Sequence, residues 1–274
     1  MTVANKWYLR DPVSNHETEV PIRLLRSTIG KLSAAGKIPL STKSPRDRWI
    51  AHDWFHSLHL YAEMRGGYPN GSNGNDGGIR LFPNRQRDKN VVRLPSPRLL
   101  PLMDTADVLL KRRTWRAFKA DMITSRDLSD ALYYGARRYP LRSLDVYLII
   151  LRVDNIPRGV YRYNADAHLL ETVREGDFTD SIYNASQRQY VDNSAVVFLI
   201  SADYSRAMRD NRNAAAYSNI MIDAARLAHL IILTATCLGL KNFLTPAIKE
   251  SITDDLLTLD GWSKGSLYLV AIGR

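Results

Sequence analysis

The sequence predicts an α+β domain that follows an N-terminal extension, and three features indicate this organisation. Residues 144–153, 194–202 and 266–273 are apolar runs of strand length, and their continuity is typical of buried strands. Residues 213–238 read as one long, mostly apolar helix, which would lie against such a sheet. The first hundred residues lack this regularity. We therefore expect an extension over residues 1–100 and a core domain over residues 101–274.

Within the extension, apolar residues recur at helical spacing over residues 20–36 and again over residues 48–64. Residues 66–78 read GGYPNGSNGNDGG, a tract with too little apolar surface to order itself, so we expect a mobile loop. Residues 84–102 are basic and punctuated by proline, which favours an extended chain.

The core elements follow in a mixed order. A helix over 125–136 has Thr124 or Ser125 as its N-cap and Leu128 and Leu132 on one face. Residues 159–173 alternate as VYRY, pass through an Asn-Ala-Asp turn and continue as LLETV, which indicates a hairpin. The remaining expected elements are a helix over 105–113, a short strand over 241–244 and a helix over 249–259.

Composition limits the classes of function. The 274 residues carry a formal net charge of +10, which favours an anionic partner. A single cysteine, Cys237, excludes a disulfide framework and a multi-cysteine metal site. No apolar run near residue 1 resembles a secretory signal. The longest apolar stretch, residues 227–240, is too short to span a bilayer. We expect a cytoplasmic protein that does not use a membrane.

Two alternative site interpretations are weaker. His52 and His56 have the i, i+4 spacing of a zinc-binding helix. Asp53 stands where such helices usually have Glu, and its side chain is one methylene shorter. We therefore favour an amphipathic helix without a metal. Basic residues at 80–93 and 111–119 would suit nucleic acid, but they lie in separate segments and no nucleic-acid-binding motif accompanies them. We therefore do not expect a nucleic-acid partner.

The sharpest feature is the run KRRTWRAFK at residues 111–119. Arg112, Arg113 and Arg116 surround the hydroxyl of Thr114 at the start of a structured segment. Guanidinium groups bind phosphate oxygens through paired hydrogen bonds, so this arrangement can hold one phosphate.

The order of motifs from this point resembles the nitroreductase-fold flavoproteins, and most closely their SagB-type branch of azoline dehydrogenases. The resemblance rests on RRTWRAF, the helix LSDALYYG, the strand LDVY, the hairpin beginning GVYRY, the long helix ending CLGLKN and the closing strand SLYLVAIG. It covers residues 85–274 well and residues 1–84 loosely. It implies a nitroreductase-like fold, with a central and mostly antiparallel sheet flanked by helices.

The resemblance also implies an FMN cofactor at the interface of a homodimer. Carried over by position, the expected cofactor contacts are Arg112, Arg113, Thr114, Arg116, Ser143, Pro246, Ala247 and Arg274. In such enzymes the flavin transfers the hydride, while the protein supplies position and electrostatics.

Three departures from the family pattern affect the chemistry. Small residues that line the flavin ring are replaced within residues 136–143 by large cations, which would either stabilise reduced flavin or obstruct its binding. The Lys-Tyr pair of azoline dehydrogenases falls on Asn211 and Arg212, and neither is a plausible general base. A glycine of the loop after GLKN appears as Ala247, following Pro246.

We therefore expect an FMN-dependent oxidoreductase that tailors a peptide-derived natural product. It would either reduce a dehydroamino acid or dehydrogenate an azoline ring or a Cα–Cβ bond. Arg212, Tyr217 and Tyr204 are the candidate catalytic residues, as proton donors or substrate anchors. The basic surface would recruit an acidic leader peptide or co-encoded biosynthetic enzymes. The alternative is a flavin-free paralogue that serves as a scaffold subunit of a biosynthetic complex.

Overall fold

The fold is taken from a computed structural model of the chain. It describes residues 7–10, 17–20, 48–49, 54, 57, 60–61, 90–100, 104–137, 139, 143–210 and 215–274. For residues 7–10, 17–20, 210 and 215 it describes the backbone alone.

The chain falls into two units, residues 1–51 and residues 52–274. In the first unit, β1 (Trp7–Arg10) pairs with β2 (Glu17–Val20) as an antiparallel ribbon. The second unit contains a seven-stranded sheet. Its strands are β3 (Val91–Arg93), β4 (Leu144–Ile150), β5 (Gly159–Asn164), β6 (Leu169–Glu175), β7 (Val196–Asp203), β8 (Lys241–Thr245) and β9 (Lys264–Gly273).

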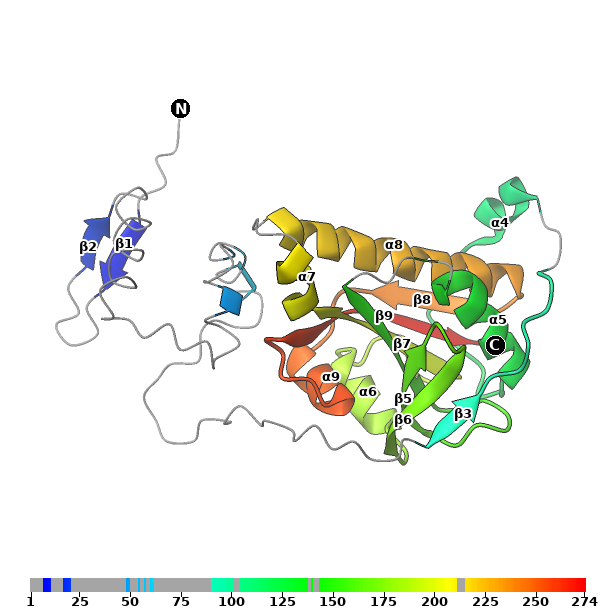
Figure 1. The fold of residues 1–274 in the computed structure, drawn as a ribbon. Helices are drawn as coiled ribbons and strands as arrows, with labels where there is room; N and C mark the ends of the chain where they lie inside the picture. The colour runs from blue at the N-terminus through cyan, green and yellow to red at the C-terminus, as the bar shows by residue number, and fades with distance from the viewer. Residues whose placement is uncertain are drawn as a thin grey trace. The chain divides into compact units, whose positions relative to one another are not determined.

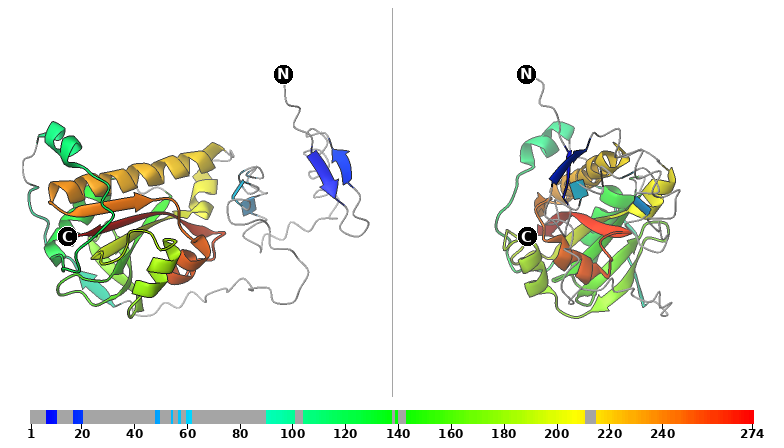
Figure 2. Two further views of the ribbon diagram at one scale, coloured as in Figure 1. Left: turned by 180° about the vertical axis from the view of Figure 1, so that it is seen from behind. Right: turned by 90° about the vertical axis from the view of Figure 1, so that its left-hand side faces the viewer.

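Helices cover both faces of this sheet. They are α4 (Thr105–Lys111), α5 (Ser125–Leu132), the π-helical turn η1 (Tyr133–Arg137), α6 (Thr179–Ala185), α7 (Tyr204–Asp210), α8 (Ala215–Cys237) and α9 (Glu250–Leu257). Figures 1 and 2 show α8 running lengthwise along one face, with α6 and α9 on the other.

The strand order is β3-β6-β5-β4-β7-β9-β8, and every pair of neighbours is antiparallel. One isolated parallel bridge, between Ile123 and Val153, lies outside the named strands. The prediction of a mostly antiparallel sheet flanked by helices is therefore confirmed. β9 is the last strand in chain order, but it lies between β7 and β8.

The apolar runs are continuous because both faces of the sheet are buried. In β4, the side chains of Tyr147 and Ile149 join the core cluster beneath α6 and α9, while Val146, Leu148 and Ile150 are buried on the opposite face. α8 meets the sheet with Ala224, Leu227, Ala228, Ile231, Ile232 and Ala235, the i, i+3, i+4, i+7 spacing of one helical face.

The apolar part of α8 is longer than the sequence predicted, since residues 227–240 alone are too short to span a bilayer. Residues Ala216–Cys237 form a helix of 22 residues with a mean hydropathy of 1.6, long and apolar enough to cross a membrane by length and composition alone. Half of that window is buried inside the fold. Its burial against β7, β8 and β9 is that of a core helix.

Most elements of the core lie where the sequence predicts them. α5 begins at the predicted N-cap, because the Thr124 hydroxyl accepts from Asp127 N–H and the Asp127 carboxylate accepts from Thr124 N–H, a capping box. The hairpin of β5 and β6, the buried strands and α8 and α9 also agree within a few residues. Two short helices, α6 and α7, were missed.

The extension is only partly described. Val91–Arg93 form a strand and pair with β6, and residues 94–100 contain neither helix nor strand. The helix predicted over 48–64 is present at Arg48, Trp49, Ser57, Leu60 and Tyr61, but Trp54 is not helical, so one continuous helix was wrong. Val20 ends β2 rather than starting a helix. The Gly/Asn tract and the rest of the helix predicted over 20–36 lie outside the described residues.

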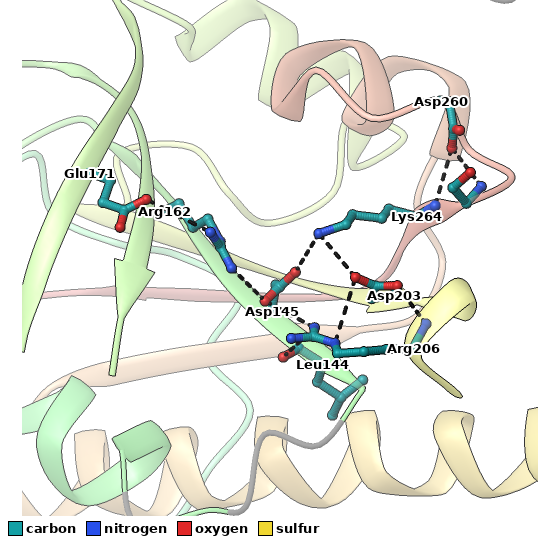
Figure 3. A network of polar contacts seen from close by, with 9 residues as sticks. Leu144, Asp145, Arg162, Glu171, Asp203, Arg206, Asp260 and Lys264 are labelled. Atoms are coloured by element: carbon teal, nitrogen blue, oxygen red, sulfur yellow. Dashed lines mark hydrogen bonds and ion pairs between the residues drawn. The ribbon is translucent and has the colours of Figure 1, made fainter. Parts of the chain in front are cut away.

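A network of ion pairs joins five strands and α7 at one end of the sheet (Figure 3). Asp145 on β4 is buried and pairs with Arg162 on β5 (3.1 Å), Arg206 on α7 (3.1 Å) and Lys264 on β9 (3.2 Å). Two further carboxylates complete the network: Asp203 pairs with Lys264 and Arg206, and Glu171 with Arg162. Three cations thus face three carboxylates, and the balance indicates a structural network.

The charge of Asp145 depends on these partners. Burial by itself raises the pKa of the Asp145 carboxyl, but the charges of Arg162, Lys264 and Arg206 outweigh burial and lower this pKa below its usual value. A carboxyl with a lowered pKa in the folded state stabilises the fold above its unfolded pKa of about 4. That stabilisation is lost as the pH falls through the folded pKa.

We expect Asp145→Asn to lower the free energy of unfolding at pH 7 by about 3 kcal/mol, because three cations lose their buried partner. The difference from the wild type should be smaller at an acid pH below the folded-state pKa of Asp145, where the wild-type carboxyl is also protonated. Urea unfolding at both pH values measures the effect, with Asp166→Asn, an exposed aspartate, as the control. An equal loss at both pH values would contradict the assignment.

Candidate functional site

The segment Arg112–Lys119, called here the cationic segment, follows α4 and lies along one margin of the sheet. It contains neither helix nor strand. Trp115 N–H donates to the carbonyl of Asn242 on β8 (2.9 Å), and Lys119 N–H donates to the carbonyl of Arg274 just after β9 (2.6 Å). These two backbone hydrogen bonds place the segment at the outer edge of β8 and at the end of β9.

Phe118 anchors this segment in the core. Its side chain is 7% exposed and belongs to the cluster beneath α6 and α9. A Cβ added at Gly273 would lie 2.9 Å from the Phe118 ring and 3.3 Å from the backbone nitrogen of Ala195. Only a residue without a side chain at position 273 leaves room for the ring.

The cations of the segment point outward from this anchor. Arg112 is half-buried, whereas Arg113, Thr114 and Arg116 are exposed. None of the three arginines forms an ion pair with a carboxylate in the part of the chain that the structure describes. Several other described arginines do have such partners: Arg98, Arg158, Arg162, Arg174, Arg206, Arg226 and Arg274. Exposed guanidiniums without a carboxylate partner can bind the oxygens of a phosphate.

Two cation–π contacts join the segment to its surroundings. The Arg116 guanidinium lies 5.5 Å from the ring centroid of Tyr190, in the loop between α6 and β7. The Lys241 ammonium, at the start of β8, lies 5.1 Å from the ring centroid of Trp115. Lys241 and Tyr190 were not among the residues predicted from sequence. Tyr190 belongs to no motif, and only the folding of its loop brings it beside Arg116.

Arg274 lies close to the segment through its backbone, but its side chain turns elsewhere. Its guanidinium pairs with Asp127 in the first turn of α5 (3.5 Å) and donates to the carbonyl of Met122 (3.3 Å). Asp127 also pairs with Arg98 (2.6 Å). Burial raises the pKa of Asp127, but hydrogen bonds from Arg98 and Thr124 lower it overall. The predicted phosphate contact of Arg274 therefore competes with a charged Asp127.

Two other predicted cofactor residues follow β8 directly. Pro246 and Ala247 are exposed, and Ala247 N–H donates to Thr245 Oγ1 (3.0 Å). Asn242, which holds the cationic segment, lies on β8 four residues before Pro246, which follows the end of that strand. At the rise of a strand the two lie about 13 Å apart, a span that suits the length of a flavin mononucleotide.

Ser143 lies at the opposite end of the sheet. Its carbonyl accepts from Asp203 N–H (2.8 Å), and Asp203 pairs with Lys264, the first residue of β9. The cationic segment lies beside Gly273, the last residue of β9. At the rise of a strand these positions are roughly 30 Å apart. Within one chain, the structure therefore does not bring Ser143 to the arginines.

Of the three predicted catalytic residues, two lie together and one lies outside the described residues. Tyr204 and Tyr217 are buried with ring centroids 6.3 Å apart, and Tyr61 contacts both at 5.3 and 6.0 Å. Burial, and then the nearby phenols of Tyr61 and Tyr217, raise the pKa of Tyr204 well above its usual value. Tyr204 therefore keeps its proton at neutral pH. Arg212 is not described.

The cations predicted to line a flavin ring are described in part. Arg137 donates to the carbonyl of Asp166 (3.0 Å) and lies 5.3 Å from the ring centroid of Tyr133. It is thus engaged with the turn between β5 and β6. Arg138 and Arg142 lie outside the described residues, as do His52 and His56 of the alternative zinc site. Among the residues that the structure describes, no group of three His, Cys, Asp or Glu side chains could hold a metal ion.

Comparisons with known proteins agree with the fold. A family model described as "Nitroreductase family" matches residues 109–274. The trifolitoxin operon protein TfxC of Rhizobium leguminosarum bv. trifolii is 26% identical over 85% of this chain and 75% of its own.

Two solved structures share the fold. A nitroreductase candidate from Anabaena variabilis matches with a TM-score of 0.61 at 18% identity, over 68% of this chain but only 42% of its own length. A chain of the Escherichia coli microcin synthetase McbBCD complex, solved with truncated pro-MccB17 bound, matches with a TM-score of 0.52 at 18% identity. That match covers 93% of this chain and 98% of the other. The nitroreductase-like fold predicted from the sequence is confirmed.

We expect Gly273→Ala to displace the cationic segment, because the new methyl group meets the Phe118 ring and a backbone atom. The free energy of unfolding should fall by about 1–3 kcal/mol. Trypsin cleavage within Arg112–Lys119 should become faster. Phe118→Leu in the same chain relieves the clash, so the double variant should lose less stability than the two single variants add up to. Simple additivity would show that the two positions do not interact.

Proposed function

The chain belongs to the nitroreductase family, whose model matches more than half of its length, and from this premise we propose that it is an FMN-dependent oxidoreductase. One observation carries the proposal: Arg112, Arg113 and Arg116, which flank Thr114 in the sequence, have no carboxylate partner among the described residues, on a segment held at the sheet by Phe118. When bound, FMN supplies hydride transfer at its flavin ring. The chain's own residues bind and orient it.

The phosphate end of the cofactor has the better-defined candidate residues. A phosphate accepts hydrogen bonds. The guanidiniums are donors only, and the Thr114 hydroxyl can also donate. Pro246 and Ala247, about 13 Å along the edge of the sheet, are the candidate contacts for the ring. Arg274 would join the phosphate contacts if its guanidinium left Asp127.

We further propose a homodimer with the cofactor between two copies. The separation of roughly 30 Å between Ser143 and the cationic segment supports this arrangement, because one small ligand cannot reach both within a single chain. A second copy can supply its Ser143 to the first copy's arginines. Leu109 and Leu110 of α4, 59% and 71% exposed beside the segment, are apolar residues that such an interface would cover.

A peptide-derived substrate is the third part of the proposal. TfxC belongs to a trifolitoxin operon, and the microcin synthetase complex was solved with a truncated pro-peptide. By analogy this chain would act on a peptide natural product beside co-encoded biosynthetic enzymes. Its formal net charge of +10 would favour an acidic leader peptide.

The reaction itself has two candidates, and the residues favour reduction. Dehydrogenation of an azoline requires a base to remove a proton, and Asn211 and Arg212 stand where relatives carry Lys and Tyr. In dehydroamino-acid reduction, a hydride adds to one carbon of the C=C bond and a proton to the other, so a proton donor suffices. Tyr217 and Tyr204 are the proposed proton donors, since a phenol with an ordinary pKa of about 10 carries its proton at neutral pH, and Arg212 is a proposed substrate anchor.

We expect the purified protein to bind FMN, and Arg113→Gln and Arg116→Gln each to weaken that binding by about 10- to 100-fold. Each variant removes a charge-assisted hydrogen bond to the phosphate. Riboflavin, which lacks the phosphate, should bind the variants and the wild type alike. Fluorescence titration with both flavins measures the two affinities.

Arg226→Gln is the control for a lost positive charge, since Arg226 lies on α8 and pairs only with Asp223 among the described carboxylates. It should leave FMN binding unchanged. Wild-type protein that binds no FMN, alone or with a co-encoded homologue, would reject the cofactor claim and favour the flavin-free scaffold. Loss of binding in the control as well would show that net charge, rather than the arginine cluster, attracts the cofactor.

A further inference from the structure

The loop between α6 and β7 is unusual in its backbone. Residues 186–194 include four residues other than glycine with left-handed φ angles: Gln187 (56°), Arg188 (60°), Tyr190 (40°) and Asn193 (59°). This region costs free energy for residues with a Cβ, and more so for a bulky side chain such as tyrosine. Strain of this kind persists only where the surroundings fix it, and it gathers at functional sites.

Several contacts fix this loop. Arg188 N–H donates to the carbonyl of Tyr183 (2.8 Å), and Ser194 N–H donates to the carbonyl of Val191 (3.1 Å). Arg152, on the segment after β4, donates to the carbonyl of Ser194 (3.0 Å). Val191 is buried in the core beside the loop. The conformation of Tyr190 is therefore imposed from both sides.

This imposed backbone directs the Tyr190 ring toward the cationic segment. One side of the ring meets Phe243 of β8, with centroids 5.2 Å apart in an edge-on arrangement. The Arg116 guanidinium lies 5.5 Å from the ring centroid. The side chain is still 40% exposed, so the ring is not needed to fill the core. Its contact with Arg116 is the feature that the strained backbone produces.

We propose that Tyr190 is a positioning residue that holds Arg116 for the phosphate of the bound cofactor. An aromatic ring attracts the face of a guanidinium and leaves the N–H groups at its edge free for a phosphate. Because no described carboxylate pairs with Arg116, the ring is the contact that restricts this long side chain. A restricted arginine loses less conformational entropy when it binds an anion.

The inference rests on the proposed function, since it concerns the same phosphate site. The test compares FMN with riboflavin, because a residue that acts through the phosphate grip changes the first affinity and not the second. Tyr190→Asn removes the ring and suits a left-handed backbone, so the variant should fold. Tyr190→Phe keeps the ring and is the conservative variant.

We expect Tyr190→Asn to weaken FMN binding by about two- to five-fold, the range of an exposed cation–π contact, with riboflavin affinity unchanged. Tyr190→Phe should keep the wild-type ratio of the two affinities. In the background of Arg116→Gln, Tyr190→Asn should have no further effect on FMN binding. Thermal unfolding of each variant confirms that the fold is intact.

The matched control is Phe178→Leu. Phe178 makes a comparable contact, with the Arg174 guanidinium 5.0 Å from its ring centroid, at the start of α6. It should change neither flavin affinity. Equal weakening of FMN and riboflavin by Tyr190→Asn, or no weakening of either, would overturn the role of Tyr190 while leaving FMN binding by the wild type in place. Wild-type protein that binds neither flavin would overturn the proposed function as well.

Discussion

The position of the Phe118 ring in the space left by Gly273 is the constraint on which the candidate site depends. The cationic segment has no helix or strand to hold it, and its arginines have no carboxylate partners among the described residues. The buried ring, two backbone hydrogen bonds and two cation–π contacts keep it at the edge of β8. Without the close approach at Gly273, the same charges would be distributed over a mobile surface chain.

Several cations elsewhere in the described fold form ion pairs, which distinguishes them from the arginines of the cationic segment. At one end of the sheet, Arg162, Arg206 and Lys264 are balanced by Asp145, Asp203 and Glu171. On α5, Asp127 and Asp130 engage Arg98, and Asp127 also engages Arg274. These cations have carboxylate partners, while Arg112, Arg113 and Arg116 have none among the described residues. The three are thus left to pair with an external anion.

Local patterns in the sequence predicted much of the fold, but they did not predict contacts between residues far apart in the chain. The buried strands and α8 were visible because both faces of the sheet and one face of the helix are apolar, and the hairpin because its turn is polar. α7 was missed because it continues β7 directly with mixed residues. The contact of Tyr190 with Arg116 and the separation of Ser143 from the arginines depend on loop path and strand register, which no local pattern encodes.

The place of β9 in the sheet has a consequence for how the chain acquires its structure during synthesis. β9 is made after β7, α8 and β8, but it lies between β7 and β8. Until β9 is made, β8 has no neighbouring strand in the sheet and the apolar face of α8 has only part of its sheet to cover. A chain that lacks β9 therefore leaves apolar surface exposed, and such surface makes partly folded chains prone to aggregation.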